Sequence, residues 1–389
     1  MSRKKIILTS ILSVLGALVL FILCYVGYIL LSYYRIEDNY PLTIEDGSSR
    51  EVVEVGKSYT ISTYNIGFGA YSQDYTFFLD SGYLPDGTVV TGYYSTARSY
   101  DECLENVTGA INTISKIDAD FMLFQEVDTN STRSHKINQY QMIKDKFINT
   151  SSVYASNFHT AFLPYPLYDM HGKVEAGLVT VSKYDIQSAV RKSFTVATDL
   201  SKLFDLDRCF SYSEINVANN KKLIIVNVHM SAYDEGGVIR KAQREELNNF
   251  LDEMYSKGHY IIVGGDYNHD LLTYNPEYDY DFDTNPAFND YIGMLKPDWL
   301  QQFFNSDSSV ELANGFRVVS SDNAPTCRDA SVNWVKGESY VTTIDGFIVS
   351  DNVEVELCET IITSGGRLNV DHFAYSDHDP VIMKFKLKE

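Results

Sequence analysis

Five short segments, far apart along the chain, each place an Asn, Glu, Asp or His at the end of an apolar run. Carboxylate and amide oxygens suit a hard divalent cation. Imidazoles and carboxylates can move protons or stabilise charge on a phosphate. The pattern therefore predicts a site that cleaves phosphoesters with the help of a metal ion. The segments are 62–66 (STYNI), 124–128 (FQEVD), 227–230 (NVHM), 264–268 (GGDYN) and 376–380 (SDHDP).

Taken singly, each of these residues has a simpler explanation. Asn65 could form a turn after a strand, and Glu126 could be a solvated strand end. His229 could be an ordinary core histidine, while Asp266 and Asn268 could close turns through their side chains. The order and spacing of the segments, rather than any one residue, favour a catalytic site.

Strands recur along the chain from residue 57 onward, several of them followed by an amphipathic helix. This succession predicts an α/β sandwich of four layers, in which two mixed β-sheets pack face to face with helices outside. Functional groups at the strand ends would then be held by rigid sheets. The expected strands are 57–65, 120–126, 175–183, 223–229, 259–266, 340–350 and 380–387, and the expected helices are 101–117 and 238–255.

The acidic composition limits the kinds of partner. A formal net charge of −20 argues against a protein that grips nucleic acid along a basic groove, because such a groove needs Lys and Arg against the phosphates. A catalytic cation can still supply local positive charge, and a solvated acidic surface explains the composition equally well. The five cysteines show no zinc-ligand spacing and no CxxC, so disulfides and free thiols are both compatible with the sequence.

The N-terminus carries an apolar run from Ile6 to Leu31, preceded by Arg3, Lys4 and Lys5. It is long enough to span a bilayer as a helix and too long for the core of a cleaved signal peptide. The basic residues place the N-terminus in the cytoplasm and the remainder outside. We therefore expect a cytoplasmic tip and transmembrane anchor over 1–35, a tether over 36–57 and a catalytic domain over 58–389. An extended tether would reach about 60–70 Å.

Across residues 58–387 the chain resembles the endonuclease/exonuclease/phosphatase superfamily. This superfamily includes pancreatic-type deoxyribonuclease, abasic-site endonucleases, neutral sphingomyelinases and inositol-polyphosphate 5-phosphatases. The motifs that carry the resemblance occur in the superfamily's order. They are TYNI at 63–66, FQEV at 124–127, VNVH at 226–229, GGDYN at 264–268, TTIDGFIVS at 342–350 and SDHDP at 376–380.

The resemblance implies a role for each motif residue. Glu126 would be the principal metal ligand, with Asn65 and Asp377 in the same metal cluster. Asp266 would orient and deprotonate the attacking water, and Asn268 would hold the phosphate. The remaining three implied residues are His229, which would donate to a phosphoryl oxygen or protonate the leaving group, His378, which would stabilise the phosphoryl charge, and Asp345, which would fix the tautomer of His378. The sequence leaves open which histidine is the general acid.

The resemblance implies a phosphoester hydrolase that uses a metal-activated water, and the N-terminal run places it as a membrane-anchored, extracytoplasmic enzyme, which we expect to be monomeric. Mg²⁺ is the implied cofactor, and Mn²⁺ could replace it. Three kinds of activity remain open: a nuclease, a hydrolase of lipid headgroups or inositol phosphates, and a non-catalytic binding module on the same fold. The last is disfavoured because no expected catalytic position is lost. Two insertions rich in aromatic residues, 68–100 and 271–299, could bind lipid or form a solvated lid over the site.

Overall fold

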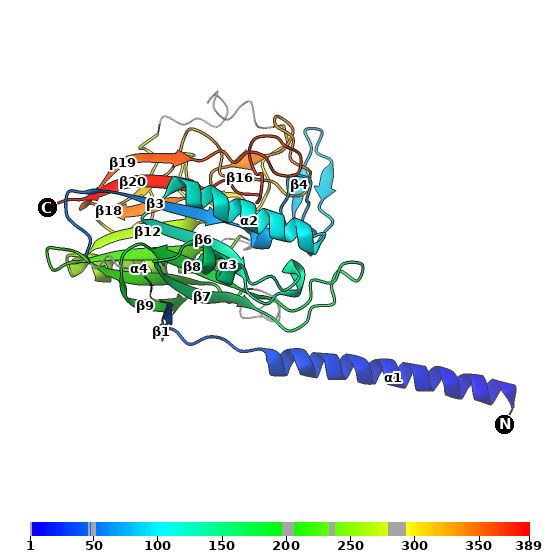
Figure 1. The fold of residues 1–389 in the computed structure, drawn as a ribbon. Coiled ribbons are helices and arrows are strands. Elements are labelled where there is room, and N and C mark those ends of the chain that lie inside the picture. Colours follow the sequence, from blue (N-terminus) through cyan, green and yellow to red (C-terminus); the bar gives the residue numbers. More distant parts are fainter. Residues whose placement is uncertain (1, 46, 48–51, 197–205, 233–237, 279–292) are drawn as a thin grey trace.

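The computed structural model describes all residues except 1, 46, 48–51, 197–205, 233–237 and 279–292. Two seven-stranded sheets dominate it (Figure 1). The first has the order β1-β9-β10-β11-β12-β18-β15 and the second the order β19-β20-β3-β6-β8-β7-β2. Each sheet combines parallel and antiparallel neighbours, since β11 and β12 are parallel, as are β3 and β6.

The strands of the first sheet are β1 (Tyr40–Pro41), β9 (Ile186–Ser193), β10 (Cys209–Asn216), β11 (Lys222–His229), β12 (Tyr260–Asp266), β18 (Asp345–Ser350) and β15 (Phe316–Val319). Those of the second are β19 (Val353–Thr360), β20 (Val381–Leu387), β3 (Ser58–Asn65), β6 (Phe121–Asp128), β8 (Glu175–Ser182), β7 (Ser151–His159) and β2 (Ile44–Glu45). Three small pairs complete the strands: β4 (Ser81–Tyr83) with β5 (Val89–Thr91), β13 (His269–Asp270) with β14 (Gln301–Gln302), and β16 (Cys327–Arg328) with β17 (Val341–Thr342).

Helices cover the outer faces of both sheets, as the four-layer prediction requires. The helices are α1 (Arg3–Ser32), α2 (Tyr100–Ile117), α3 (Gln139–Lys146) and α4 (Val238–Ser256), with short 3₁₀ turns η1 (Gly67–Gly69) and η2 (Thr132–Ser134). The apolar face of α2, including Val107 and Ile111, packs on the outer face of the second sheet. Leu247 and Leu251 of α4 pack in the same way on the first sheet. The α/β sandwich is thus confirmed.

Between the sheets lies a core of alternate side chains from facing strands. Ile61 and Leu123 from the second sheet meet Ile225 and Ile262 from the first. Because successive side chains of a strand point to opposite faces, the other residues of these strands serve the outer layers. This packing holds the ends of β3, β6, β11 and β12 in fixed relation to one another, and the site lies at these ends.

Most predicted elements begin and end within about two residues of the observed ones, with two informative differences. The run 340–350 divides into β17 and β18, so Asp345 begins a strand instead of lying within one. The insertion 68–100 contains the β4–β5 hairpin. The five cysteines are free thiols. Residues 279–292 of the second insertion lie outside the described residues.

The tether expected over 36–57 is bound to the domain. β1 pairs with β9 and β2 with β7, so this segment adds an edge strand to each sheet. Val53 bridges to Val217 and is fully buried. Just before the segment, Nε of Arg35 donates to Oδ1 of Asp207 at 2.8 Å. The reach of about 60–70 Å holds only for an extended chain, whereas in the structure the chain contacts the domain directly after α1. The division into anchor, tether and catalytic domain stays a prediction.

Candidate active site

The ends of β11, β12 and β18 bring three of the predicted residues together. The strand register pairs Asp266 with His229 on one side and with Asp345 on the other. Gly265 precedes Asp266 where a side chain would not fit, because an added Cβ would lie 1.9 Å from the carbonyl oxygen of Val228. Gly265 of the GGDYN motif thus allows the close strand contact that presents Asp266.

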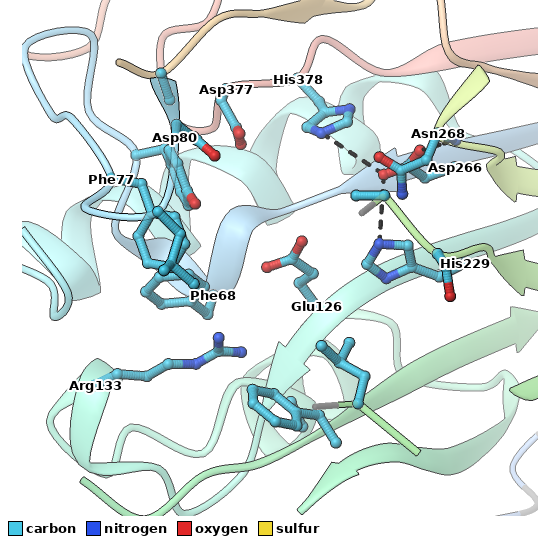
Figure 2. A pocket seen from close by; sticks show the side chains of 18 of the residues that line it. Phe68, Phe77, Asp80, Glu126, Arg133, His229, Asp266, Asn268, Asp377 and His378 are labelled. Carbon is cyan, nitrogen blue, oxygen red and sulfur yellow. Dashed lines mark hydrogen bonds and ion pairs between the residues drawn. The ribbon is translucent and has the colours of Figure 1, made fainter. Parts of the chain in front are cut away.

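Glu126 lies at an irregularity in the second sheet. Between Phe124 and Val127 the register of β6 against β8 shifts, and Glu126 has a φ of 55°. A bulge of this kind re-aims a side chain, and here the Glu126 carboxylate points into the cavity between Arg133 and the histidines (Figure 2). Burial raises its pKa above the ordinary glutamate value.

Asn65, at the end of β3, connects two carboxylates. Its Nδ2 donates to Oε1 of Glu126 at 3.2 Å and to Oδ2 of Asp266 at 3.0 Å. Its Oδ1 accepts from the backbone N–H of Gly67 at 3.0 Å. In this arrangement the amide positions both carboxylates, and the direct contact of Asn65 with a metal stays a prediction.

The opposite wall holds two histidines around Asp266. Nε2 of His229 lies 3.5 Å, and Nε2 of His378 3.8 Å, from Oδ2 of Asp266. Nδ1 of His378 lies 2.8 Å from Oδ2 of Asp345. Asp345 therefore fixes the proton of His378 on Nδ1, and Nε2 faces the cavity (Figure 2).

Burial and neighbouring charges shift the pKa values of these groups in different directions. Burial, together with the nearby Asp345 carboxylate, raises the pKa of Asp266 to about 7. Burial opposes the charge on His378, but Asp345 outweighs it and raises the pKa of His378 well above its usual value. Burial, with Arg208 nearby, lowers the pKa of His229 well below its usual value. Of the two histidines, His378 is thus the one whose surroundings favour the charged form.

Asn268 and Asp377 complete the predicted set. The backbone N–H of Asn268 donates to Oδ1 of Asp266 at 2.8 Å, and its Nδ2 donates to the Met230 carbonyl at 2.9 Å. Asn268 and the half-buried Asp377 both line the cavity. Oγ of Ser376 lies 3.2 Å from Oδ1 of Asp377 and donates to the Asn65 carbonyl at 2.8 Å, which ties the SDHDP segment to β3. The structure thus brings all eight predicted residues to one site.

Thr326, which is outside the predicted set, hydrogen-bonds to the backbone at the start of β18 and so positions Asp345. Oγ1 of Thr326 accepts from the backbone N–H of Ile344 at 3.0 Å and from that of Asp345 at 3.2 Å. These bonds fix the start of β18 and so the direction of the Asp345 carboxylate. The sequence gives only a weak signal for this role, namely that Thr326 precedes the Asp345 strand as a threonine does in some relatives of the superfamily.

The cavity has a volume of about 890 Å³ and a lining of both charged and apolar side chains. Three arginines that the motifs did not single out, Arg133, Arg208 and Arg328, line it together with the catalytic groups. Arg133 forms a two-point ion pair with Asp128 at 2.9 and 3.1 Å and stacks over Phe68. The apolar part of the lining consists of Phe68, Tyr71, Phe77, Phe78, Leu79, Phe158, Leu163, Pro164 and Tyr165.

The donor set fits a divalent cation. Oxygen ligands from Glu126 and Asp377 line the same cavity as Asp266, and Mg²⁺ and Mn²⁺ favour such ligands. The buried Glu126 carboxylate has a raised pKa, so a positive charge beside it would relieve an unfavourable burial. Elsewhere in the site, the close group Asp266, Asp345 and His378 is accounted for by the hydrogen bond between the last two.

A family model described as the Endonuclease/Exonuclease/phosphatase family matches residues 62–378. The chain belongs to this family. Its members are metal-dependent phosphoester hydrolases, and this chain is such an enzyme. All eight predicted site residues, from Asn65 to His378, lie within the matched range. The earlier alternative of a non-catalytic module on this fold is thereby set aside.

Solved structures of the family share the fold at low sequence identity. One is ANGEL2, a 2′,3′-cyclic phosphatase, in complex with adenosine-2′,3′-vanadate: 15% identity, TM-score 0.51, over 90% of this chain and 99% of that one. Another is truncated TDP2 of Caenorhabditis elegans, with 12% identity and TM-score 0.49 over 85% and 99% of the two chains. A family member from Bacteroides vulgatus has 15% identity and TM-score 0.48 over 85% and 100%. No curated protein sequence matches the chain significantly.

Proposed function

We propose that the protein is a membrane-anchored, extracytoplasmic hydrolase of phosphodiesters that depends on Mg²⁺. The observation that carries the proposal is the convergence of Glu126, Asp266 and the Asp345–His378 pair on one cavity. Hydrolysis needs an acceptor for the water proton, a positive group for the phosphoryl oxygens and a place for the cation. Asp266, His378 and the carboxylates of Glu126 and Asp377 would meet these three needs in turn.

The residues that would hold the cation are Glu126 and Asp377, with Asn65 beside them. When bound, the cation would offset part of the negative charge on the phosphate. Mn²⁺ prefers the same oxygen ligands and would replace Mg²⁺.

Asp266 acts on the water. A pKa of about 7 lets this carboxylate exist in its basic form and still accept a proton near neutral pH. The amide of Asn65 and the backbone N–H of Asn268 hold its two oxygens at 3.0 and 2.8 Å, so the side chain does not have to reorient during the reaction.

The histidines act on the phosphate. His378, held by Asp345, presents a charged Nε2–H to a phosphoryl oxygen and stabilises the charge that grows there. His229 and Asn268 bind the phosphate from the β11–β12 side. Because the Asp345 carboxylate raises the pKa of His378, we propose His378 as the source of the proton for the leaving oxygen.

The membrane anchor is α1. This helix is long enough and apolar enough to cross a bilayer, and Arg3, Lys4 and Lys5 lie at its N-terminal end. Basic residues of this kind stay on the cytoplasmic side. The catalytic domain is then extracytoplasmic, and we propose that it acts as a monomer.

The test is a metal and substrate panel on the full chain in detergent. Bis-p-nitrophenyl phosphate reports phosphodiester cleavage in general, while plasmid DNA, RNA, inositol phosphates and sphingomyelin report the substrate class. We expect cleavage with Mg²⁺ or Mn²⁺ that stops with a chelator and returns when the metal is restored. Cleavage that persists after exhaustive chelation would contradict the proposal.

A further inference from the structure

An exposed apolar loop lies beside the cavity. Residues 162–170 read FLPYPLYDM, and the loop's apolar side chains reach solvent to an unusual degree, 76% for Leu167 and 68% for Tyr165. The single acid of the loop, Asp169, is turned inward, where its carboxylate accepts from the backbone N–H groups of Ser95 and Thr96 at 2.7 and 3.1 Å. We call the exposed set the aromatic platform; it comprises Phe162, Tyr165, Leu167, Tyr168 and Met170.

The platform is joined directly to α1. The hydroxyl of Tyr25 donates to the Phe162 carbonyl at 2.8 Å, and the Phe162 N–H donates to the hydroxyl of Tyr28 at 3.1 Å. A few residues further, the ring of Tyr34 stacks on that of His159 with centroids 4.1 Å apart. These contacts, with the Arg35–Asp207 ion pair, fix how the domain sits on its anchor.

The length of α1 places these contacts at the bilayer surface. Its 30 residues make a helix about 45 Å long at about 1.5 Å per residue. The hydrocarbon core of a bilayer is about 30 Å thick, so about ten residues lie outside it. The basic N-terminal tip accounts for about three, and the last two turns, with Tyr25 and Tyr28, for the rest. Tyrosine favours this headgroup zone, and the platform lies at the same level.

The loop that carries the platform also forms part of the apolar lining of the cavity. The rings of Tyr165 and Phe78 meet with centroids 5.8 Å apart, and both residues line the cavity, as do Leu163 and Pro164. In Figure 1, β3 and β6 run toward the same side as α1 extends, so the edge that holds the catalytic groups faces the way the anchor points. The apolar part of the cavity lining therefore includes Leu163 and Tyr165 of the same loop that contacts α1.

We propose that the aromatic platform rests in the outer headgroup layer and that the phosphoester cleaved belongs to a membrane lipid. This inference rests on the proposed function. The lipid phosphate would lie among Arg133, Arg208 and the histidines, and the adjoining apolar part would lie along Phe77, Phe78 and Leu163. Water adds to phosphorus, the P–O bond to the departing alcohol breaks, and one proton of the water passes to the alcohol oxygen while the other remains on the phosphate product.

The experiment uses the full chain reconstituted in phosphatidylcholine vesicles. The variant Leu167→Glu puts a charge on the platform without touching the cavity lining, and Ile148→Glu is the matched control. Ile148 is 72% exposed and lies just before β7, whereas the platform follows the other end of that strand. Hydrolysis is measured on labelled phosphatidylcholine, phosphatidylethanolamine, phosphatidylglycerol and sphingomyelin in the vesicles, and on soluble bis-p-nitrophenyl phosphate.

We expect Leu167→Glu to lower hydrolysis of at least one of these lipids by about tenfold or more, because a buried leucine contact with the bilayer is lost and a charge is brought into it. Its rate on bis-p-nitrophenyl phosphate and both rates of Ile148→Glu should stay within about twofold of wild type. Plasmid DNA cleaved faster than any of the lipids, or equal lipid hydrolysis by Leu167→Glu and wild type, would overturn the proposal.

A second readout does not depend on turnover. In a Leu167→Trp variant, vesicles made with brominated phosphatidylcholine should quench the added fluorescence, whereas an Ile148→Trp variant should show no such quenching once the wild-type signal is subtracted. Absence of quenching at position 167 would overturn the docking of the platform. Failure of the wild type on bis-p-nitrophenyl phosphate, with quenching intact, would instead refute the proposed function and leave the docking in place.

Discussion

The carboxylate of Asp345 lies 2.8 Å from Nδ1 of His378, although the two residues are 33 positions apart. Asp345 begins β18 of the first sheet, and His378 lies just before β20 of the second sheet. Both are buried. An imidazole held in this way keeps its proton on Nδ1 and directs Nε2 at the substrate. The pair therefore connects the packing of the two sheets to the chemistry at the cavity.

Replacement of Asp345 by Asn should reduce kcat by about 10- to 100-fold with little change in KM, because Asp345 acts through His378 and does not touch the substrate. The measurement is steady-state hydrolysis of bis-p-nitrophenyl phosphate. A nuclear magnetic resonance titration should also show a lower pKa for His378, since the neutral amide no longer stabilises its charged form. An unchanged kcat would remove Asp345 from the mechanism.

Thr326 should act as a positioning residue for Asp345. Its hydroxyl oxygen accepts from the N–H groups of Ile344 and Asp345, and Thr326→Val leaves both buried donors unpaired. We expect a several-fold loss of kcat, while Thr326→Ser, which keeps the hydroxyl, restores most of it. Equal activity of the Val and Ser variants would show that the hydroxyl has no role in catalysis.

Glu126→Gln should weaken metal binding. Calorimetric titration with Mn²⁺ should give an affinity lower by at least about a hundredfold. Mutation of residues that only hydrogen-bond to a metal ligand already lowers metal affinity by about 10- to 100-fold, and loss of a ligand itself costs more. Glu105→Gln is the control, because Glu105 is exposed on α2. Equal Mn²⁺ affinity for wild type and Glu126→Gln would refute the assignment of Glu126 as a ligand.

The motifs predicted the strand ends well because each motif couples an apolar run, which determines a buried strand, to a polar residue at its end. Asn65, His229 and Asp266 could be placed in this way. The left-handed conformation of Glu126 could not, since it arises from a bulge in the pairing of β6 with β8. The local sequence determines that this segment forms a strand, but the pairing with the partner strand determines where its register shifts.

Contacts over long sequence separations also escaped prediction. Arg35 and Asp207 are 172 residues apart, and no periodicity connects them, so the segment after α1 was expected to be a free tether. The cavity arginines, such as Arg133, lie outside every motif and become recognisable only when folding brings them to the same cavity as Glu126.

The attachment of α1 should depend on pH through Asp207. This buried carboxyl pairs with Arg35 and Arg191. Burial opposes its charge, but His159 and the arginines lower its pKa from 3.8 to about 2. A lowered pKa contributes stability above pH 3.8, and this contribution is lost as the pH falls through about 2. A shift of this size corresponds to about 2 kcal/mol.

Denaturant unfolding of the full chain in mild detergent tests this prediction. Asp207→Asn should lower the free energy of unfolding by about 2 kcal/mol at pH 7, and the difference from wild type should shrink between pH 4 and about pH 2. Asp252→Asn, at an exposed position of α4, should show no such pH-dependent difference. A difference for Asp207→Asn that stays constant down to pH 2 would contradict the linkage.

The most direct test of the account is the effect of Asp266→Asn on Mg²⁺-dependent hydrolysis of bis-p-nitrophenyl phosphate by the full chain, with Asp252→Asn as the control. Asp266 accepts from Asn65 and Asn268 and lies beside both histidines, so its amide isostere fits the same space but cannot take the proton of water. If Asp266 accepts the proton of water, Asp266→Asn should lower kcat by about 10²-fold or more, with an unchanged circular dichroism spectrum and full activity of the control. Full activity of a folded Asp266→Asn variant would contradict it.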